Sequence, residues 1–122
     1  MKNILIVDDD LGFVCWLVSV LIKGDYQPWP SCSVPDAIEI MGKQPGALDL
    51  VIVNPSLSGA SSLIAGYRQL KANLQVLALG RHRQPQLPGP TTWLRKPTAG
   101  DRESRQKWLR AVDRLTGRQA AA

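Results

Sequence analysis

The sequence predicts an α/β domain in which a parallel β-sheet is covered by helices on both faces. Short apolar runs alternate along the chain with longer segments whose apolar residues recur at helical spacing. This alternation is typical of right-handed βαβ units. The 122 residues fit one domain, and 44% hydrophobic with 20% charged residues allow a packed core. We expect one domain over residues 1–117 and a flexible tail over 118–122.

The first half of the chain predicts two strands and two helices. Residues 3–7, "NILIV", are a short apolar run, typical of a strand buried on both faces. Residues 11–22 are almost continuously apolar and predict a largely buried helix that ends at Lys23-Gly24. The next strand, "YQPWPS" at 26–31, contains two prolines two positions apart. Their missing N–H groups point to the same side, which an edge strand tolerates if that side faces solvent.

The rest of the chain continues the alternation. Ser33 is the expected N-cap of a helix that runs to about Met41. We then expect a strand at 48–53, a helix at about 61–72, and strands at 75–79 and 91–95. The last helix is expected at about 100–115, with Trp108, Val112 and Leu115 on one face.

A proline-rich edge strand in second place predicts a particular sheet. It fits the strand order 2-1-3-4-5 of the flavodoxin-like doubly wound fold. In such sheets the functional crevice lies at the carboxyl ends of the strands, near the first and third strands. Asp8, Asp9 and Asn54 follow these two strands directly, and we expect them to share one pocket. Asp10 is expected to cap the next helix and not to act as a ligand.

Three motifs resemble the receiver domain of bacterial two-component response regulators. They are "ILIVDDD" after the first strand, "LDLVIVNPSLSG" around the third and "WLRKP" after the fifth. Each is weak alone, but their order and spacing are fairly specific, and together they span nearly the whole chain.

The resemblance implies roles for six positions. In receivers an acid pair holds Mg²⁺, an aspartate accepts a phosphoryl group from a histidine kinase, and a Ser/Thr and a lysine bind the phosphoryl oxygens, while an aromatic residue reports the switch. The matching positions are Asp8 and Asp9 for the acid pair, Lys96 for the lysine, Trp93 for the aromatic residue, Asn54 for the acceptor and Gly80 for the Ser/Thr. Acceptor and hydroxyl are therefore both missing.

The residue at the acceptor position is chemically inert. An amide oxygen is neutral and the amide nitrogen lone pair is delocalised, so Asn54 cannot form an acyl phosphate. Deamidation to aspartate needs the next backbone N–H, which Pro55 lacks. Gly80 also removes one hydrogen-bond donor from any phosphate mimic.

The same change weakens the expected metal site. The pocket of Asp8, Asp9, Asn54 and Lys96 carries −1 instead of the −2 that a third carboxylate would give. One unit charge at ~4 Å is worth about 4 kcal/mol at an effective dielectric constant of ~20. We expect that no cofactor is required, that Mg²⁺ binds Asp8 and Asp9 only weakly, and that Lys96 neutralises an acid directly at rest.

The segment between Gly80 and Lys96, "RHRQPQLPGPTTWLR", departs from the receiver pattern. It is too short for a full helix and a strand, and its prolines break a helix after about one turn. We therefore expect the fourth helix to be shortened or missing. The lone His82 in this loop is expected to be exposed and non-catalytic.

Charge is unevenly distributed along the chain. Residues 1–65 carry three Lys/Arg against seven Asp/Glu, a net −4, and residues 66–122 carry a net +9. The last helix supplies a basic run of Arg102, Arg105, Lys107, Arg110, Arg114 and Arg118. A solvated face is the commonest interpretation of such a run, an interaction surface for an acidic protein is the functional one, and nucleic-acid binding is the least favoured.

These observations predict a degenerate receiver that signals by protein–protein interaction without phosphorylation. The alternative is a sensor that binds a small ligand or anion in the vacated pocket at Lys96. An enzyme is not expected, because no nucleophile–base pair is visible. A cytoplasmic protein is expected, with no membrane span, with Cys15 and Cys32 as buried or half-buried thiols, and with a homodimer left open.

Overall fold

The computed structural model describes residues 1–43, 47–80, 87, 89–97 and 102–118. They form a five-stranded sheet in the order β2-β1-β3-β4-β5, in which every neighbouring pair is parallel. The predicted fold class is therefore confirmed. The elements in chain order are β1 Asn3–Val7, α1 Leu11–Lys23, β2 Gln27–Ser31, α2 Val34–Lys43, β3 Leu50–Val53, α3 Ala60–Leu70, β4 Gln75–Leu79, β5 Thr92–Leu94 and α4 Arg102–Thr116.

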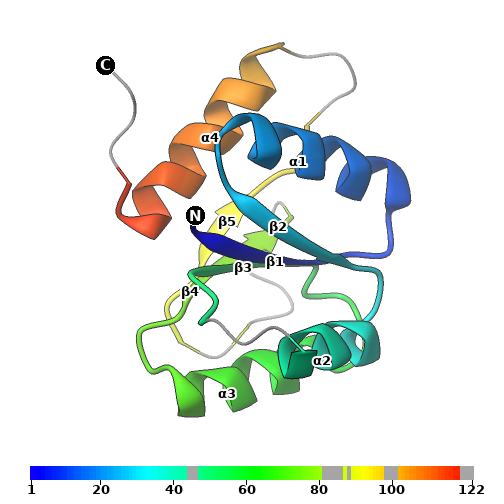
Figure 1. Ribbon diagram of the computed structural model, residues 1–122. Helices are drawn as coiled ribbons and strands as arrows, with labels where there is room; N and C mark the ends of the chain where they lie inside the picture. The colour runs from blue at the N-terminus through cyan, green and yellow to red at the C-terminus, as the bar shows by residue number, and fades with distance from the viewer. Residues whose placement is uncertain (44–46, 81–86, 88, 98–101, 119–122) are drawn as a thin grey trace.

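The helices form two layers, with α1 and α4 on one face of the sheet and α2 and α3 on the other (Figure 1). Alternate strand residues serve the two layers because successive side chains of a strand point to opposite faces. Ile4 and Ile6 pack with α1 and α4, whereas Leu5 and Val7 pack with α2 and α3. All four side chains are fully buried, which explains why β1 reads as a continuous apolar run.

The proline-rich segment is the edge strand, as predicted. Gln27 N–H donates to the carbonyl of Lys2 at 2.9 Å, so alternate N–H groups of β2 point to β1. Pro28 and Pro30, which are in register with Ile4 and Ile6, occupy the positions whose nitrogens point away from the sheet. The two missing donors therefore cost no ladder hydrogen bonds.

The last helix packs as its apolar spacing predicted. Trp108 is 1% exposed and Val112 is fully buried, and Leu115 packs against the same cluster. Trp108 meets Phe13 edge-on at 5.6 Å between ring centroids. This aromatic contact ties α4 to α1 and holds the two helices in one layer.

The prediction that the first helix and both cysteines are buried is wrong in part. Helix α1 buries its inner residues, but Leu11 and Ile22 are 65% and 56% exposed, and Cys15 and Cys32 are exposed as well. An almost continuous apolar run cannot reveal that only one side of a helix is covered when the domain is three layers thick. The outer side of α1 is apolar but uncovered.

Two sequence predictions reach beyond the described residues. No helix occurs among the described residues between β4 and β5, and residues 81–86, with His82, lie outside the description. Of the predicted tail, Arg118 is described: its guanidinium lies over the Tyr26 ring, 4.6 Å from the centroid, and donates to the Gly24 carbonyl. The boundary between domain and tail stays a prediction.

Candidate functional site

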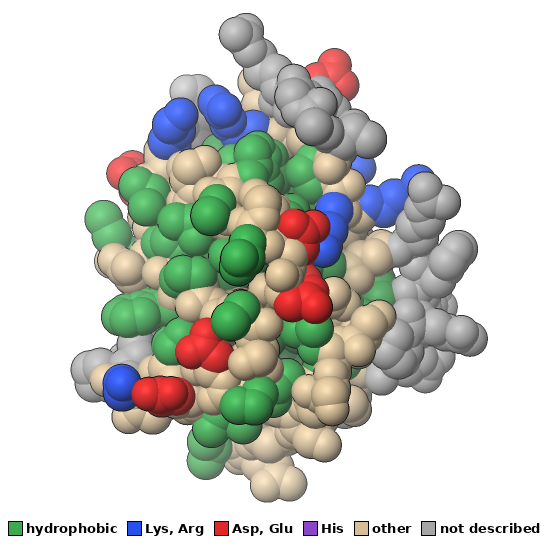
Figure 2. Space-filling model, turned by 90° about the vertical axis from the view of Figure 1, so that its right-hand side faces the viewer, with side chains coloured by type: hydrophobic (Ala, Val, Ile, Leu, Met, Phe, Trp, Pro, Cys, Tyr) green, Lys and Arg blue, Asp and Glu red, His purple; other side chains and the backbone are tan. Residues whose placement is uncertain are grey.

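The candidate site lies where β1, β3 and β5 end at the same edge of the sheet. Asp8 N–H donates to the carbonyl of Ser31 at 3.1 Å, and Asn54 N–H donates to that of Val7 at 2.9 Å. These bonds extend the sheet ladder by one residue, so both side chains start from fixed backbone. Figure 2 looks onto these strand ends and shows acidic side chains beside basic ones at its centre.

Asp8 is the buried centre of the site. It is 0% exposed, and a buried carboxylate needs strong partners. Its Oδ1 accepts a hydrogen bond of 3.0 Å from Asn54 Nδ2, and its Oδ2 forms an ion pair of 2.7 Å with Lys96 Nζ. The structure therefore brings these three predicted residues together.

The Asn54 amide is held by two bonds that fix its orientation. Its Nδ2 donates to Asp8, and its Oδ1 accepts from the backbone N–H of Ser56 at 2.9 Å. An amide satisfies both partners because it has a donor and an acceptor on one carbon. A carboxylate could accept from Ser56 but would set a second anion against Asp8. The asparagine thus satisfies both neighbours without adding a negative charge.

Asp10 takes a part in the site that the sequence analysis assigned only to capping. As predicted, it caps α1, because its Oδ1 accepts from Phe13 N–H at 3.2 Å. Its Oδ2 also lies 3.4 Å from Lys96 Nζ. An N-cap carboxylate uses one oxygen for the helix, so the free second oxygen was the signal for this contact.

Lys96 is enclosed by charge and by an aromatic ring. Its ammonium lies 5.2 Å from the centroid of the Phe13 ring. Partial burial works to lower the pKa of Lys96, but the hydrogen bonds and charges of Asp8 and Asp10 outweigh it and the pKa is raised. The bond from Phe13 N–H, together with the nearby Lys96, lowers the pKa of Asp10. Lys96 therefore stays charged and held between two carboxylates.

The geometry fits a resident magnesium ion poorly. Asp9 is exposed, while Asp8 points its two oxygens at Asn54 and Lys96. The Asn54 oxygen faces a backbone N–H, so it would have to turn to act as a ligand. Among the described residues, no three His, Cys, Asp or Glu side chains are placed to hold a metal ion.

Gly80 and Trp93 lie against each other at the ends of β4 and β5. Gly80 has φ = +146°, and a Cβ at this position would meet the six-membered ring of Trp93 at 3.7 Å. Its N–H donates to the Leu94 carbonyl at 3.1 Å. A side chain at position 80 would therefore lie beside the half-buried ring of Trp93. Glycine supplies no hydroxyl at this position.

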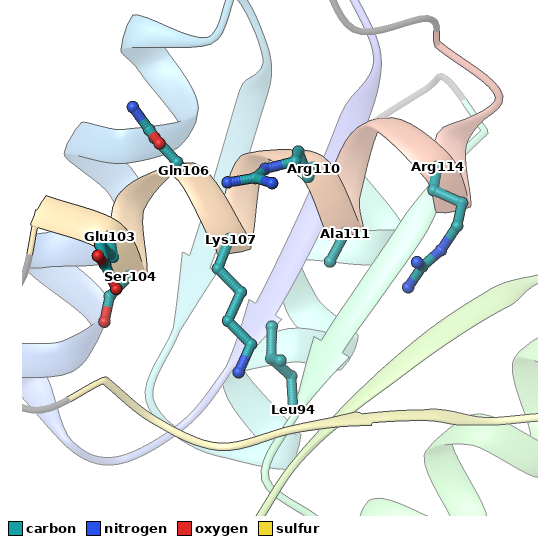
Figure 3. A pocket seen from close by; sticks show the side chains of 8 residues that line it. All are labelled: Leu94, Glu103, Ser104, Gln106, Lys107, Arg110, Ala111 and Arg114. Carbon is teal, nitrogen blue, oxygen red and sulfur yellow. The ribbon is translucent and has the colours of Figure 1, made fainter.

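A basic hollow lies between α4 and β5. Its volume is about 640 Å³, and Figure 3 shows Lys107 and Arg114 extending from α4 toward the side where Leu94 lies, while Gln106 extends the other way. Of the predicted surface residues, Arg110 and Arg114 line the hollow, and Arg105 is exposed outside the lining. The side chain of Arg102 lies outside the description. Lys107, which belongs to the same predicted basic run, also lines the hollow.

Comparisons with solved structures agree on the architecture. A response regulator receiver domain protein from Clostridium thermocellum superposes with a TM-score of 0.77 at 16% identity, over 96% of this chain and 95% of that one. The chain has the receiver fold. A two-component response regulator from Clostridium difficile gives 0.76 at 18% over 99% and 100% of the two chains. A response regulator protein from Thermotoga maritima in complex with Mg²⁺-BeF gives 0.68 at 23% over 94% and 99%.

Sequence comparison adds no family assignment to the receiver fold. No family model matches the chain, and no curated protein sequence matches it. At identities below 25%, the structural likeness establishes the fold, and function has to be argued from the site. Within the described ranges, no helix combines the length and the apolar character that a membrane span requires.

Proposed function

We propose that this chain is a degenerate receiver domain of two-component signalling that works by protein–protein interaction without phosphorylation at residue 54. One observation carries the proposal. Asn54 donates to a buried aspartate that is already paired with a lysine. The pocket keeps the acid and the lysine of a receiver, but an inert amide stands where the phosphoryl acceptor would be.

The chemistry of the pocket supports a fixed state. Asn54 has no nucleophilic oxygen, and Pro55 blocks its conversion to aspartate. Lys96 is held by Asp8 at 2.7 Å and by Asp10 at 3.4 Å. Two of the three ammonium donors of Lys96 are therefore already engaged by carboxylates, which leaves little for a phosphoryl oxygen. The domain would then present the same surface at all times, with no enzymatic activity of its own.

The alternative function, a sensor for small anions at Lys96, receives less support. An anion would have to displace two carboxylates from the ammonium, and Asp8 is fully buried. The displaced charge would then lack a partner, which costs several kcal/mol. The one ligand that we propose for the pocket is Mg²⁺, bound weakly by Asp8 and Asp9 at high Mg²⁺ concentration.

The partner surface proposed here is the basic hollow of α4 and β5. Its basic side chains are Lys107, Arg110 and Arg114, with Arg105 exposed nearby. Leu94 and Ala111 add an apolar floor, so an acidic segment with one apolar anchor would match it in charge and shape. The cationic side chains stand on one rigid helix, which limits the entropy lost on binding.

The decisive experiment is incubation with acetyl phosphate and Mg²⁺ followed by intact mass spectrometry. We expect no stable gain of a phosphoryl group in the wild type. A gain that disappears in Asn54→Ala would refute the proposal, because residue 54 would then be an acceptor. A gain that persists in Asn54→Ala would move the acceptor to another carboxylate such as Asp9.

The partner surface has a separate test. Titration with an acidic peptide should give binding that Arg110→Glu/Arg114→Glu abolishes and Lys43→Glu, on the opposite helix layer, leaves unchanged. Binding to nucleic acid of arbitrary sequence that exceeds binding to acidic peptides at moderate salt would instead favour the least expected use of the basic run. A cytoplasmic location belongs to the same proposal.

A further inference from the structure

The outer side of α1 has a composition that the fold does not explain. The α1 face is defined here as Leu11, Gly12, Cys15, Ser19 and Ile22, all of which are exposed. No charged residue occurs between Leu11 and Ile22, although an outward helix side in a soluble domain is normally charged. Leu11, Cys15 and Ile22 lie within ~40° of one another around the helix axis. They form one apolar stripe.

The neighbours of α1 leave this stripe uncovered in the described chain. The inner residues Phe13, Leu17 and Leu21 pack on the sheet, and Trp16 turns toward α4, where it meets Trp108 at 6.3 Å. Leu11, Cys15 and Ile22 therefore lie on the side of α1 away from α4, toward β2. Figure 2 shows hydrophobic side chains gathered on one side of the central acids, with few charges among them.

The edge of the sheet next to α1 restricts what can cover the stripe. β2 presents Pro28 and Pro30 with their nitrogens pointing outward, so an extended chain cannot add to this edge by a regular ladder. Pro30 is exposed and extends the apolar surface. The surface is therefore suited to a helix packed on its side chains, and not to an added strand.

The charges at the two ends of α1 identify the occupant. Asp9 and Asp10 precede the helix, and Lys23 is its last residue. If two copies of α1 pack antiparallel about a two-fold axis between positions 16 and 17, Leu11 of one meets Ile22 of the other. Lys23 of each then reaches Asp9 of the other. A two-fold interface needs one surface that complements itself, and this one does so in both apolarity and charge.

The backbone favours the same arrangement. The small side chains Gly12, Cys15 and Ser19 allow two helices to approach closely, and antiparallel packing places opposite helix dipoles side by side. We propose that this chain forms a two-fold symmetric dimer in which the α1 faces of two copies pack antiparallel. The dimer does not depend on the function proposed for the pocket and leaves the α4–β5 hollow open.

The test is the oligomeric state of the full chain by sedimentation velocity over a range of micromolar concentrations. The wild type should be a dimer that dissociates on dilution. Ile22→Glu should raise its Kd at least ~100-fold, because two carboxylates would be buried without partners. Leu70→Glu, at an 85% exposed position on α3, is the matched control and should leave the Kd unchanged. Circular dichroism checks that both variants fold.

A charge swap makes the test specific for the antiparallel arrangement. Lys23→Glu should weaken the dimer at least ~3-fold, and adding Asp9→Lys should restore it, since each pair is then reversed across the interface. A wild type that stays monomeric at the highest concentration would overturn the proposal. A dimer whose Kd is unchanged in Ile22→Glu would also overturn it, because the interface would then lie elsewhere. A monomer that binds a different protein through α1 would overturn it as well.

Discussion

Replacing Asn54 with aspartate would restore the receiver acceptor but should destabilise this protein. The Asn54 amide nitrogen lies 3.0 Å from Asp8 Oδ1, so the variant would place two carboxylate oxygens at that separation. Two unit charges at 3 Å repel by about 5 kcal/mol at an effective dielectric constant of ~20. Residue 54 is half-buried and Lys96 stays nearby, so we expect a net loss of about 2–4 kcal/mol in unfolding free energy at neutral pH.

The loss should depend on pH with a definite sign. Repulsion makes one carboxyl of the pair keep its proton above the ordinary pKa of about 4. A raised folded-state pKa of an acid means that stability is lost as pH rises through the interval between the two values. The difference between variant and wild type should thus be small near pH 4 and full at pH 7. Added Mg²⁺ should reduce it, because the cation would neutralise the pair.

Urea unfolding followed by tryptophan fluorescence measures this effect at both pH values, with EDTA or with Mg²⁺. Asn54→Ala is the matched control, because it removes the same hydrogen bonds without adding charge, and it should cost about 1–3 kcal/mol with little dependence on Mg²⁺. If Asn54→Asp in EDTA at pH 7 proves as stable as the wild type, the two side chains are not in contact and the account of the pocket is wrong.

Three further predictions use the same assay. Lys96→Met should lower the unfolding free energy by about 2 kcal/mol. This is less than the usual loss of about 3–5 kcal/mol for a broken buried ion pair, because Lys96 is partly exposed. Lys96→Arg should recover part of the loss. Asp10 has a lowered pKa, so the stability it contributes is present above pH ~4 and is lost as pH falls through the lowered value. Asp10→Asn should therefore make the unfolding free energy depend less on pH in the acid range. An unchanged pH dependence would contradict this role of Asp10. Trp108→Ala should lower the unfolding free energy by about 3–5 kcal/mol, followed by the fluorescence of the remaining tryptophans. A loss below ~1 kcal/mol would show that Trp108 does not anchor α4.

The sheet was predictable because its signals are local. Buried parallel strands read as apolar runs, and two prolines at alternate positions of the second strand indicate an edge, which favoured the order 2-1-3-4-5 that the sheet has. The pocket followed from that order, since chain ends of neighbouring parallel strands meet at one edge. The place of Lys96 beside Asp8 was expected from the resemblance to receivers, because β5 is not a neighbour of β1 in the sheet.

The remaining features depend on tertiary context that residue patterns do not carry. The exposure of Cys15 and Ile22 depends on what lies outside α1, and the hydropathy of a helix does not record whether a second layer covers it. The contact of Asp10 with Lys96 depends on where the chain runs after β5. Its capping role was predictable because it is made within three residues.

The two prolines of β2 also bear on how the protein behaves when it is crowded or partly opened. Amyloid-like growth proceeds by adding strands to an exposed edge, and each addition requires a donor at every second residue. Pro28 and Pro30 remove those donors from one whole border of the sheet. Strand-by-strand aggregation is therefore barred at that border, and replacing both prolines with valine would restore the missing donors, one of them at the buried position 28.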